Sequence, residues 1–375
     1  MKIAFLIGEL DPQVGQTNTI IELIFYLLNN HSDWKITIFS PRIINRKEID
    51  KIFENKVEIM KLNKYYMSMI APNSITKLLN IYDIFFVKGN YEYVIPAIRT
   101  SKPVILSIAQ IDSPKLFNSI KKKVLALGNI ILTKYIIKKV TLISVPLEEV
   151  GDFYKRKYNI SPIVIEDIIS DQFFVNEDNR INSPSLINEI KLLSVGYWDG
   201  INGRKRQHEL LKYFKYAQAR IPSLRLTLVG LRKEDIIFLK NFANQLNIDK
   251  FVELKGYLTR EKLVEEYIKN HIYVTATTYE GFYRQIIEAF ATGMPGLVYD
   301  SRIITKDLSK SASVIHVLKS NGGLIFKDYK TFTDGVLNIL NNYNMFSKNA
   351  INYANNFRSK KIGAKIEKLI FDLVK

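Results

Sequence analysis

The sequence has 375 residues, of which 47% are hydrophobic and 24% are charged. This length suggests two domains, and the composition excludes an intrinsically disordered chain. The chain contains no cysteine, which excludes disulfides, zinc–thiolate sites and thiol nucleophiles. Lysine and arginine exceed aspartate and glutamate by 54 − 37 = 17. This excess favours an anionic partner, such as a nucleotide diphosphate, a phospholipid surface or a nucleic acid, although a generally lysine-rich composition would explain it equally well.

The first ten residues, MKIAFLIGEL, are too short and too soon interrupted by an acid for a signal peptide, and we predict a strand there. No run approaches the ~18 consecutive apolar residues that a membrane-spanning helix requires. We therefore expect a cytoplasmic protein.

The first half alternates short apolar runs with amphipathic segments, which is typical of a doubly wound α/β domain. Residues 1–7 are predicted to form a strand and residues 17–30 a helix, with a polar turn between them. Strands of a parallel sheet are buried on both faces and are therefore apolar throughout. By this criterion we predict further strands at 34–39, 81–87, 103–108 and 140–145.

The polar stretch 175–189 is the best candidate for a linker, and the α/β pattern restarts after it. We predict domains at 1–178 and 190–356, with 357–375 forming a C-terminal helix that packs back on the first domain. The predicted strands of the second domain are 190–195, 224–229, 252–254, 271–276 and 296–299, and its helices are 207–220, 232–246, 260–269 and 283–292.

The most informative segment is 279–295, YEGFYRQIIEAFATGMP. A strand ends before Glu280, Gly281 permits a tight turn, and a helix begins near Tyr283. The unpaired N–H groups of a helix N-terminus can bind a diphosphate, and a carboxylate beside it can accept hydrogen bonds from sugar hydroxyls. Glu280 and Glu288 thus suit a nucleotide sugar, but two glutamates alone would fit a solvated helix surface at least as well.

This segment resembles the EGFG…LLEAMACGTPV block of the retaining glycosyltransferases with the GT-B fold, the large EX7E family of glycosyl transferases group 1. Glu280 and Glu288 match its pair of glutamates, and Ala289, Gly293 and Pro295 match in register. The resemblance covers nearly the whole chain, more weakly in the first half. It implies two Rossmann-like, doubly wound parallel-sheet domains facing each other across a cleft. The N-terminal domain would bind the acceptor and the C-terminal domain the nucleotide-sugar donor.

The resemblance also implies roles for individual residues. Glu280 would contact the donor sugar near the reacting carbon, and Glu288 would bind the ribose. The family's catalytic lysine aligns with Arg206, or with Lys205 if the loop differs by one residue. Together with Arg204, this residue would neutralise the diphosphate. The further donor-binding positions are Gly256, which matches a family glycine, and Gly281, Phe282, Tyr283 and Arg284, whose amides would hold sugar hydroxyls or the distal phosphate.

Several positions depart from the family pattern. Gly15 is followed by Gln16 where the family has two glycines that contact the distal phosphate, and Gln110 stands where a histidine is usual on the acceptor side. Tyr197 replaces an arginine. Tyr283 adds bulk at a glycine position, and Arg284 replaces an apolar residue, where it would meet an acidic sugar, an acceptor phosphate or solvent.

Residues 113–147 contain seven lysines and no acidic residue, and apolar residues are interspersed among the lysines. A basic amphipathic helix can lie on an anionic membrane surface, although an ordinary lysine-rich surface helix would have the same composition. We therefore expect peripheral association with the cytoplasmic face of a membrane.

The sequence as a whole favours transfer of a hexose from a nucleotide-diphosphate sugar to a glycan or lipid-linked acceptor, with retention of anomeric configuration. We expect no metal requirement, since arginine and lysine can neutralise the diphosphate and the four histidines are scattered. One alternative is a relative without transferase activity, such as a nucleotide-sugar epimerase. The other is a basic nucleic-acid-binding protein, which we do not expect because no aromatic–basic or zinc motif is present.

Overall fold

The computed structural model describes residues 1–62, 73–89, 94–109, 111, 120–176, 189–301 and 311–375. The chain divides into two compact units, Met1–Ile168 with Ser359–Lys375, and Ile169–Arg358. The division falls before the stretch 175–189 because Ile169 pairs with Arg358, and Phe173 packs edge-on against Tyr267 at 5.6 Å. Each unit is described by itself.

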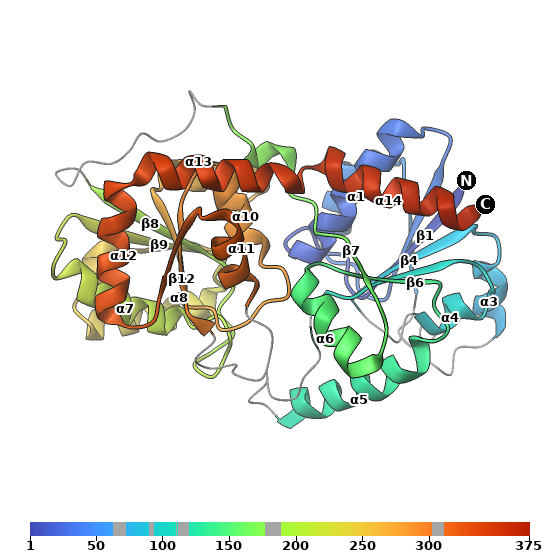
Figure 1. The fold of residues 1–375 in the computed structure, drawn as a ribbon, viewed down its shortest axis with the longest axis horizontal. Coiled ribbons are helices and arrows are strands. Elements are labelled where there is room, and N and C mark those ends of the chain that lie inside the picture. The colour runs from blue at the N-terminus through green and yellow to red at the C-terminus, as the bar shows by residue number, and fades with distance from the viewer. Residues whose placement is uncertain (63–72, 90–93, 110, 112–119, 177–188, 302–310) are drawn as a thin grey trace. The chain divides into compact units, whose positions relative to one another are not determined.

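The first unit contains a parallel sheet (Figure 1). Its inner strands are almost wholly buried, whereas its two edge strands are only partly buried. Its strand order is β3-β2-β1-β4-β5-β6-β7. Because the chain proceeds from β1 outward through β2 and β3, and then resumes at β4 on the other side, the order reverses between β1 and β4. The strands are β1 (Lys2–Ile7), β2 (Lys35–Ser40), β3 (Glu58–Lys61), β4 (Ile84–Lys88), β5 (Val104–Ser107), β6 (Leu142–Val145) and β7 (Ile163–Val164).

Helices cover both faces of this sheet. The core on one face joins β1, β2 and β4 to α1 (Gly15–Asn30), α2 (Arg46–Phe53) and the C-terminal helix α14 (Ser359–Val374). Figure 1 shows α14 alongside α1. The other helices of the unit are α3 (Asn73–Leu79), α4 (Val94–Ile98), α5 (Ile120–Ile136) and α6 (Glu148–Tyr158).

Specific contacts hold α14 on α1. A Cβ on Gly363 would lie 2.4 Å from the ring of Tyr26, so only glycine permits this close approach of the two helices. The Tyr26 hydroxyl donates a hydrogen bond of 2.9 Å to Glu367, which also pairs with His31. The last helix of the chain is therefore part of the first unit.

The second unit repeats the arrangement with strand order β10-β9-β8-β11-β12-β13, all pairs being parallel. Its order reverses between β8 and β11. The strands are β8 (Ile190–Val195), β9 (Leu224–Val229), β10 (Val252–Leu254), β11 (Ile272–Thr275), β12 (Gly296–Tyr299) and β13 (Gly323–Phe326).

A core of this unit lies between the sheet and α7 (Gln207–Gln218), α8 (Lys233–Gln245) and α12 (Tyr329–Asn341). The remaining helices are α9 (Arg260–Lys269), α10 (Arg284–Ala291), α11 (Ala312–Ser320) and α13 (Tyr343–Ala354). The predicted fold class, α/β with two doubly wound parallel-sheet domains, is confirmed.

Candidate active site

In open parallel α/β sheets, ligands bind beyond the carboxyl ends of the strands, where the strand order reverses. In the second unit this point lies between β8 and β11. The loop after β8 carries Lys205, and the loop after β11 carries Glu280. The Lys205 Nζ lies 2.9 Å from the Glu280 Oε1, and their side chains are only 6% and 20% exposed. The fold thus joins two of the predicted site residues in an ion pair at the place where a ligand is expected.

The loop between β8 and α7 is shaped by Asp199. Its carboxylate accepts hydrogen bonds from the backbone N–H groups of Arg204 and Lys205, at 2.8 and 3.0 Å. The Arg204 carbonyl in turn accepts the N–H of Thr278, which ties this loop to the one after β11. Gly196, the first residue after β8, has φ +145°, a conformation that suits glycine, and a Cβ there would lie 3.8 Å from the Lys205 Nζ. These contacts position the Lys205 ammonium group. No sequence motif predicts them.

The two loops perturb one another electrostatically. Burial alone would raise the pKa of Glu280, but Lys205 and Arg204 outweigh it and hold this pKa below its ordinary value. Burial would likewise lower the pKa values of Lys205 and Arg204, yet the Glu280 carboxylate raises both. All three groups are therefore charged at neutral pH, with two cations and one anion in a largely buried site.

Lys205, rather than Arg206, is the residue that the fold brings to Glu280. The Arg206 backbone is left-handed, with φ 49°, just before α7 begins. Its guanidinium lies 4.9 Å from the centre of the Tyr299 ring and 3.8 Å from Glu209. Tyr197, at the family's arginine position, is exposed, and its ring centre lies 5.7 Å from the Lys205 Nζ.

Tyr283 precedes α10 and does not project into solvent. Its side chain is buried, and the centre of its ring lies 5.0 Å from the Lys205 Nζ. Gly281 and Phe282 are also buried, and the Phe282 carbonyl accepts a hydrogen bond of 2.6 Å from the Nε2 of His316. This role of His316 could not be predicted from the sequence, because a single histidine in an apolar segment matches no motif.

Glu288 lies within α10 and is already engaged. The Tyr267 hydroxyl donates to its Oε2 at 3.1 Å, and the Arg284 Nε lies 3.7 Å from its Oε1. Burial is the main reason why the pKa of Glu288 is raised, although Arg284 and Tyr267 oppose the shift. Arg284 does not face solvent: its side chain is 8% exposed and lies beside Glu288, one turn further along the helix.

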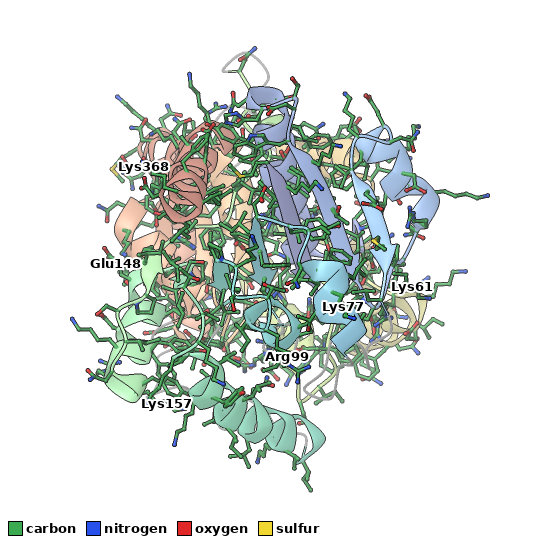
Figure 2. All side chains as sticks on the ribbon, turned by 90° about the vertical axis from the view of Figure 1, so that its right-hand side faces the viewer. Lys61, Lys77, Arg99, Glu148, Lys157 and Lys368 are labelled. Atoms are coloured by element: carbon green, nitrogen blue, oxygen red, sulfur yellow. The ribbon has the colours of Figure 1, made fainter. Side chains whose placement is uncertain are left out.

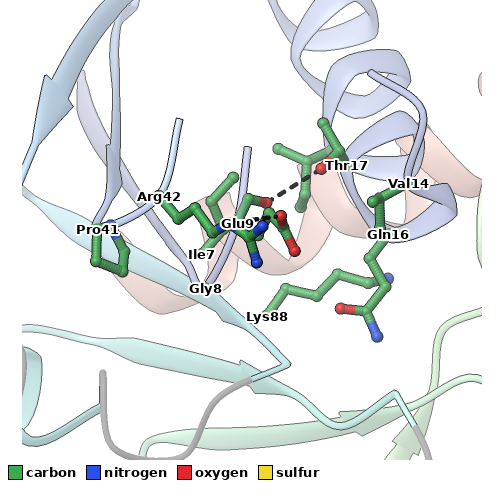
Figure 3. Close-up of a pocket in the computed structure, with 10 residues that line it drawn as sticks. Ile7, Gly8, Glu9, Val14, Gln16, Thr17, Pro41, Arg42 and Lys88 are labelled. Carbon is green, nitrogen blue, oxygen red and sulfur yellow. Dashed lines mark hydrogen bonds and ion pairs between the residues drawn. The ribbon is translucent and has the colours of Figure 1, made fainter. Parts of the chain in front are cut away.

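The first unit has a pocket of about 500 Å³ at its own reversal point, between the carboxyl ends of β1 and β4 and the start of α1 (Figure 3). Gln16 lines it, and Gly15 begins α1. Arg42 pairs with Glu9 at 3.2 Å across the rim. Lys88, which also lines the pocket, is buried and paired with Asp167.

Another predicted position, Gly256, takes no part in these contacts. Gly256 follows β10, and its carbonyl accepts the N–H of Gly230. Gln110 lies outside the described residues. Within the described ranges, no group of three or more His, Asp or Glu residues could hold a metal ion, and no helix is long and apolar enough to cross a membrane.

Comparisons with known proteins agree with this architecture. The chain is similar in structure to HepE of Anabaena in complex with UDP and glucose, at 15% identity and a TM-score of 0.76 over 100% of both chains. It is also similar to sucrose-phosphate synthase of Thermosynechococcus elongatus, at 16% identity and a TM-score of 0.73 over 100% of this chain and 99% of that one. The pneumococcal O-GlcNAc transferase GtfA, in complex with UDP and GlcNAc, gives 11% identity and a TM-score of 0.72 over 100% and 99%.

At these identities the likeness establishes the fold alone. No curated protein sequence matches the chain. Residues 178–357, which include the Lys205–Glu280 pair, match the family described as glycosyl transferases group 1. The chain therefore has the GT-B glycosyltransferase fold, and its second unit carries the sequence pattern of glycosyl transferases group 1.

Proposed function

We propose that the protein is a retaining glycosyltransferase that moves a hexose from a nucleotide-diphosphate sugar to a glycan or lipid-linked acceptor. The observation that carries the proposal is the Lys205–Glu280 ion pair at the reversal point of the second sheet. Similar structures that bind UDP, namely HepE and GtfA, favour a uridine nucleotide as the donor's base.

Each residue of the site has a role in this proposal. Lys205 and Arg204 bind the diphosphate and neutralise the charge that develops as it leaves, so that no metal is required. Glu280 accepts hydrogen bonds from the donor sugar, and the amides of Gly281 to Arg284 hold its hydroxyls or the distal phosphate. Glu288 binds the ribose. The low pKa of Glu280 supports its role, since a carboxylate that stays ionised is the better acceptor.

The acceptor is proposed to bind the first unit, at the pocket lined by Gln16, Arg42 and Lys88. Both cations of the pocket are paired with carboxylates, Arg42 with Glu9 and Lys88 with Asp167. Each pair places hydrogen-bond donors beside hydrogen-bond acceptors. Neighbouring sugar hydroxyls, which both donate and accept hydrogen bonds, can bind to such a pair.

A thermal-shift comparison of UDP-, GDP- and ADP-sugars tests the donor proposal. A ligand that binds only the folded state stabilises it in proportion to ln(1 + [L]/Kd), so a saturating UDP-sugar should raise the Tm by at least about 2 °C. The variant Lys205→Met is the control and should respond much less. Absence of a shift with every donor, together with steeply salt-dependent DNA binding, would instead support a nucleic-acid-binding protein.

We propose further that α5 docks on an anionic membrane surface. Ile120, Val124, Leu127, Ile131 and Tyr135 recur every three or four residues along this helix and are 46–80% exposed. Figure 2, which faces the first unit, shows α5 along its lower edge with side chains pointing outward. Lys123, Lys134, Lys138 and Lys139 are exposed, and no acidic residue lies within 113–147 to repel an anionic headgroup.

Co-sedimentation with liposomes tests this second proposal. The protein should bind vesicles rich in phosphatidylserine at low salt and be released as salt rises, because the Debye length falls from ~30 Å at 0.01 M to ~8 Å at 0.15 M. The double change Val124→Asn and Ile131→Asn should reduce binding at least about fivefold, since it removes inserting side chains. The matched change Ile237→Asn on α8 should have no effect. Equal binding by both variants would show that α5 is only a solvated helix.

A further inference from the structure

Tyr283 occupies a backbone conformation that a tyrosine seldom adopts. Its φ and ψ are 61° and 64°, in the left-handed region that glycine enters without steric cost. A bulky side chain here is disfavoured unless its contacts offset the strain. The buried contacts of the ring and hydroxyl must therefore offset this strain.

The hydroxyl of Tyr283 is held by three neighbours. It donates to the Thr275 Oγ1 at 2.7 Å and lies 3.0 Å from the Tyr273 hydroxyl and 3.4 Å from the Thr277 Oγ1. The Tyr273 hydroxyl also donates to the Val195 carbonyl at the end of β8, at 3.3 Å. The network thus connects the ring to the ends of both β8 and β11, the strands whose loops carry Lys205 and Glu280.

The ring lies against the buried ammonium group. The Lys205 Nζ is 5.0 Å from the centre of the Tyr283 ring, within the range of a cation–π contact, and 2.9 Å from Glu280. Such contacts are stronger where water is excluded, and the Lys205 side chain is only 6% exposed. The ammonium group thus contacts both the ring and the carboxylate.

We propose that Tyr283 is a positioning residue: its anchored ring supports the Lys205 ammonium opposite Glu280 and thereby sets where the donor's diphosphate binds. This inference rests on the proposed function for the identity of the ligand, but the position of the ammonium can be tested in the free protein. The family that this chain resembles has glycine at this position, whereas here the Tyr283 side chain supports Lys205.

Three variants separate the ring from the hydroxyl. Tyr283→Phe keeps the ring, Tyr283→Leu keeps apolar bulk without a π face, and Tyr283→Gly removes the side chain and suits the left-handed backbone. In the ligand-free protein, acetic anhydride labelling followed by peptide mass spectrometry reports the exposure of Lys205, with the half-exposed Lys191 as reference. Labelling of Lys205 relative to Lys191 should rise at least about threefold in the Leu and Gly variants and stay near wild type in the Phe variant.

Affinity supplies a readout that a merely structural role would not move. The Leu and Gly variants should bind UDP about 3- to 30-fold more weakly, the range expected for a desolvated cation–π contact, while uridine binding is unchanged. Wild-type labelling of Lys205 in the Leu and Gly variants would overturn the proposal, whatever donor the protein uses. So would equal losses in the Phe and Leu variants, because the hydroxyl network and not the ring would then position the lysine.

Discussion

At the residue scale, the Glu280 carboxylate is proposed to act on the reaction step. The variant Glu280→Gln keeps the shape of the side chain and removes its charge, so it should retain most nucleotide affinity. We expect turnover to fall at least ~100-fold, the usual scale for one catalytic electrostatic group. Steady-state kinetics with a UDP-sugar measure this, and turnover within twofold of wild type would remove Glu280 from the catalytic site.

Lys205 and Arg206 form a matched pair of neighbouring cations with different surroundings. Lys205→Met should weaken UDP binding by about 10- to 100-fold, because a hydrogen bond to a charged group is lost, and should leave uridine binding unchanged. Arg206→Met should change UDP binding by less than about threefold, since its guanidinium lies on Tyr299 and Glu209. Calorimetric titration with both ligands decides between them. A larger loss for Arg206→Met would restore Arg206 to the diphosphate site.

Sequence alone left this choice open for a physical reason. The loop from 196 to 206 has no periodic pattern. Its alignment with the family pattern was therefore uncertain by one residue, and either Lys205 or Arg206 could match the family's lysine. The Arg206 backbone is left-handed, and the side chains of Lys205 and Arg206 point to different partners. A left-handed backbone cannot be predicted from the sequence where the residue is not glycine. Tyr283 also has a left-handed backbone, and its size alone did not predict that its ring would be buried beside Lys205.

At the element scale, strong periodicity made the fold predictable. The bounds of β8, β9, β10, β12 and α9 agree with the predicted ranges, because buried strands and amphipathic helices have clear patterns. The strands β3 and β7 were not predicted. They are edge strands of four and two residues, only partly buried, and so short a segment carries too few apolar positions to be recognised.

The helix α11 affects the site through His316, whose Nε2 donates to the Phe282 carbonyl and whose Nδ1 lies 3.0 Å from the Tyr353 hydroxyl. Burial lowers the pKa of His316 to about 4, although the Phe282 carbonyl opposes the shift. The folded state therefore holds this histidine neutral at pH values where the unfolded chain, with an ordinary value near 6.5, is protonated.

Stability should accordingly depend on pH in a defined window. Between pH ~6.5 and ~4 the unfolded state binds the additional proton, so the free energy of unfolding falls as pH falls, by up to on the order of 3 kcal/mol for His316. His316→Gln keeps a donor for Phe282 and removes the titration, and it should flatten the profile. Urea denaturation at pH 4.5, 5.5 and 7 measures this. An equally steep profile in the variant would assign the acid sensitivity to other groups, of which His271, with a pKa of about 4 from burial, is the first candidate.

At the scale of the whole molecule, the two units repeat one design. In each, a buried lysine is paired with a carboxylate at the carboxyl edge of the sheet, Lys88 with Asp167 and Lys205 with Glu280. The net charge of +17 adds a long-range attraction for anionic ligands that neither pair provides alone. The proposed function assigns the donor to the pair of the second unit and the acceptor to the pair of the first.

Time-resolved proton NMR of donor turnover tests the proposed function most directly. UDP-glucose carries an α-linked glucose, and a retaining transferase should release UDP while the first-formed sugar product, observed before mutarotation, shows the α-anomeric signal. The Glu280→Gln variant should give the same product at least ~100-fold more slowly. A β-anomer formed first, or no UDP release by the full-length protein from any nucleotide sugar that stabilises it, would contradict the assignment of this chain as a retaining glycosyltransferase.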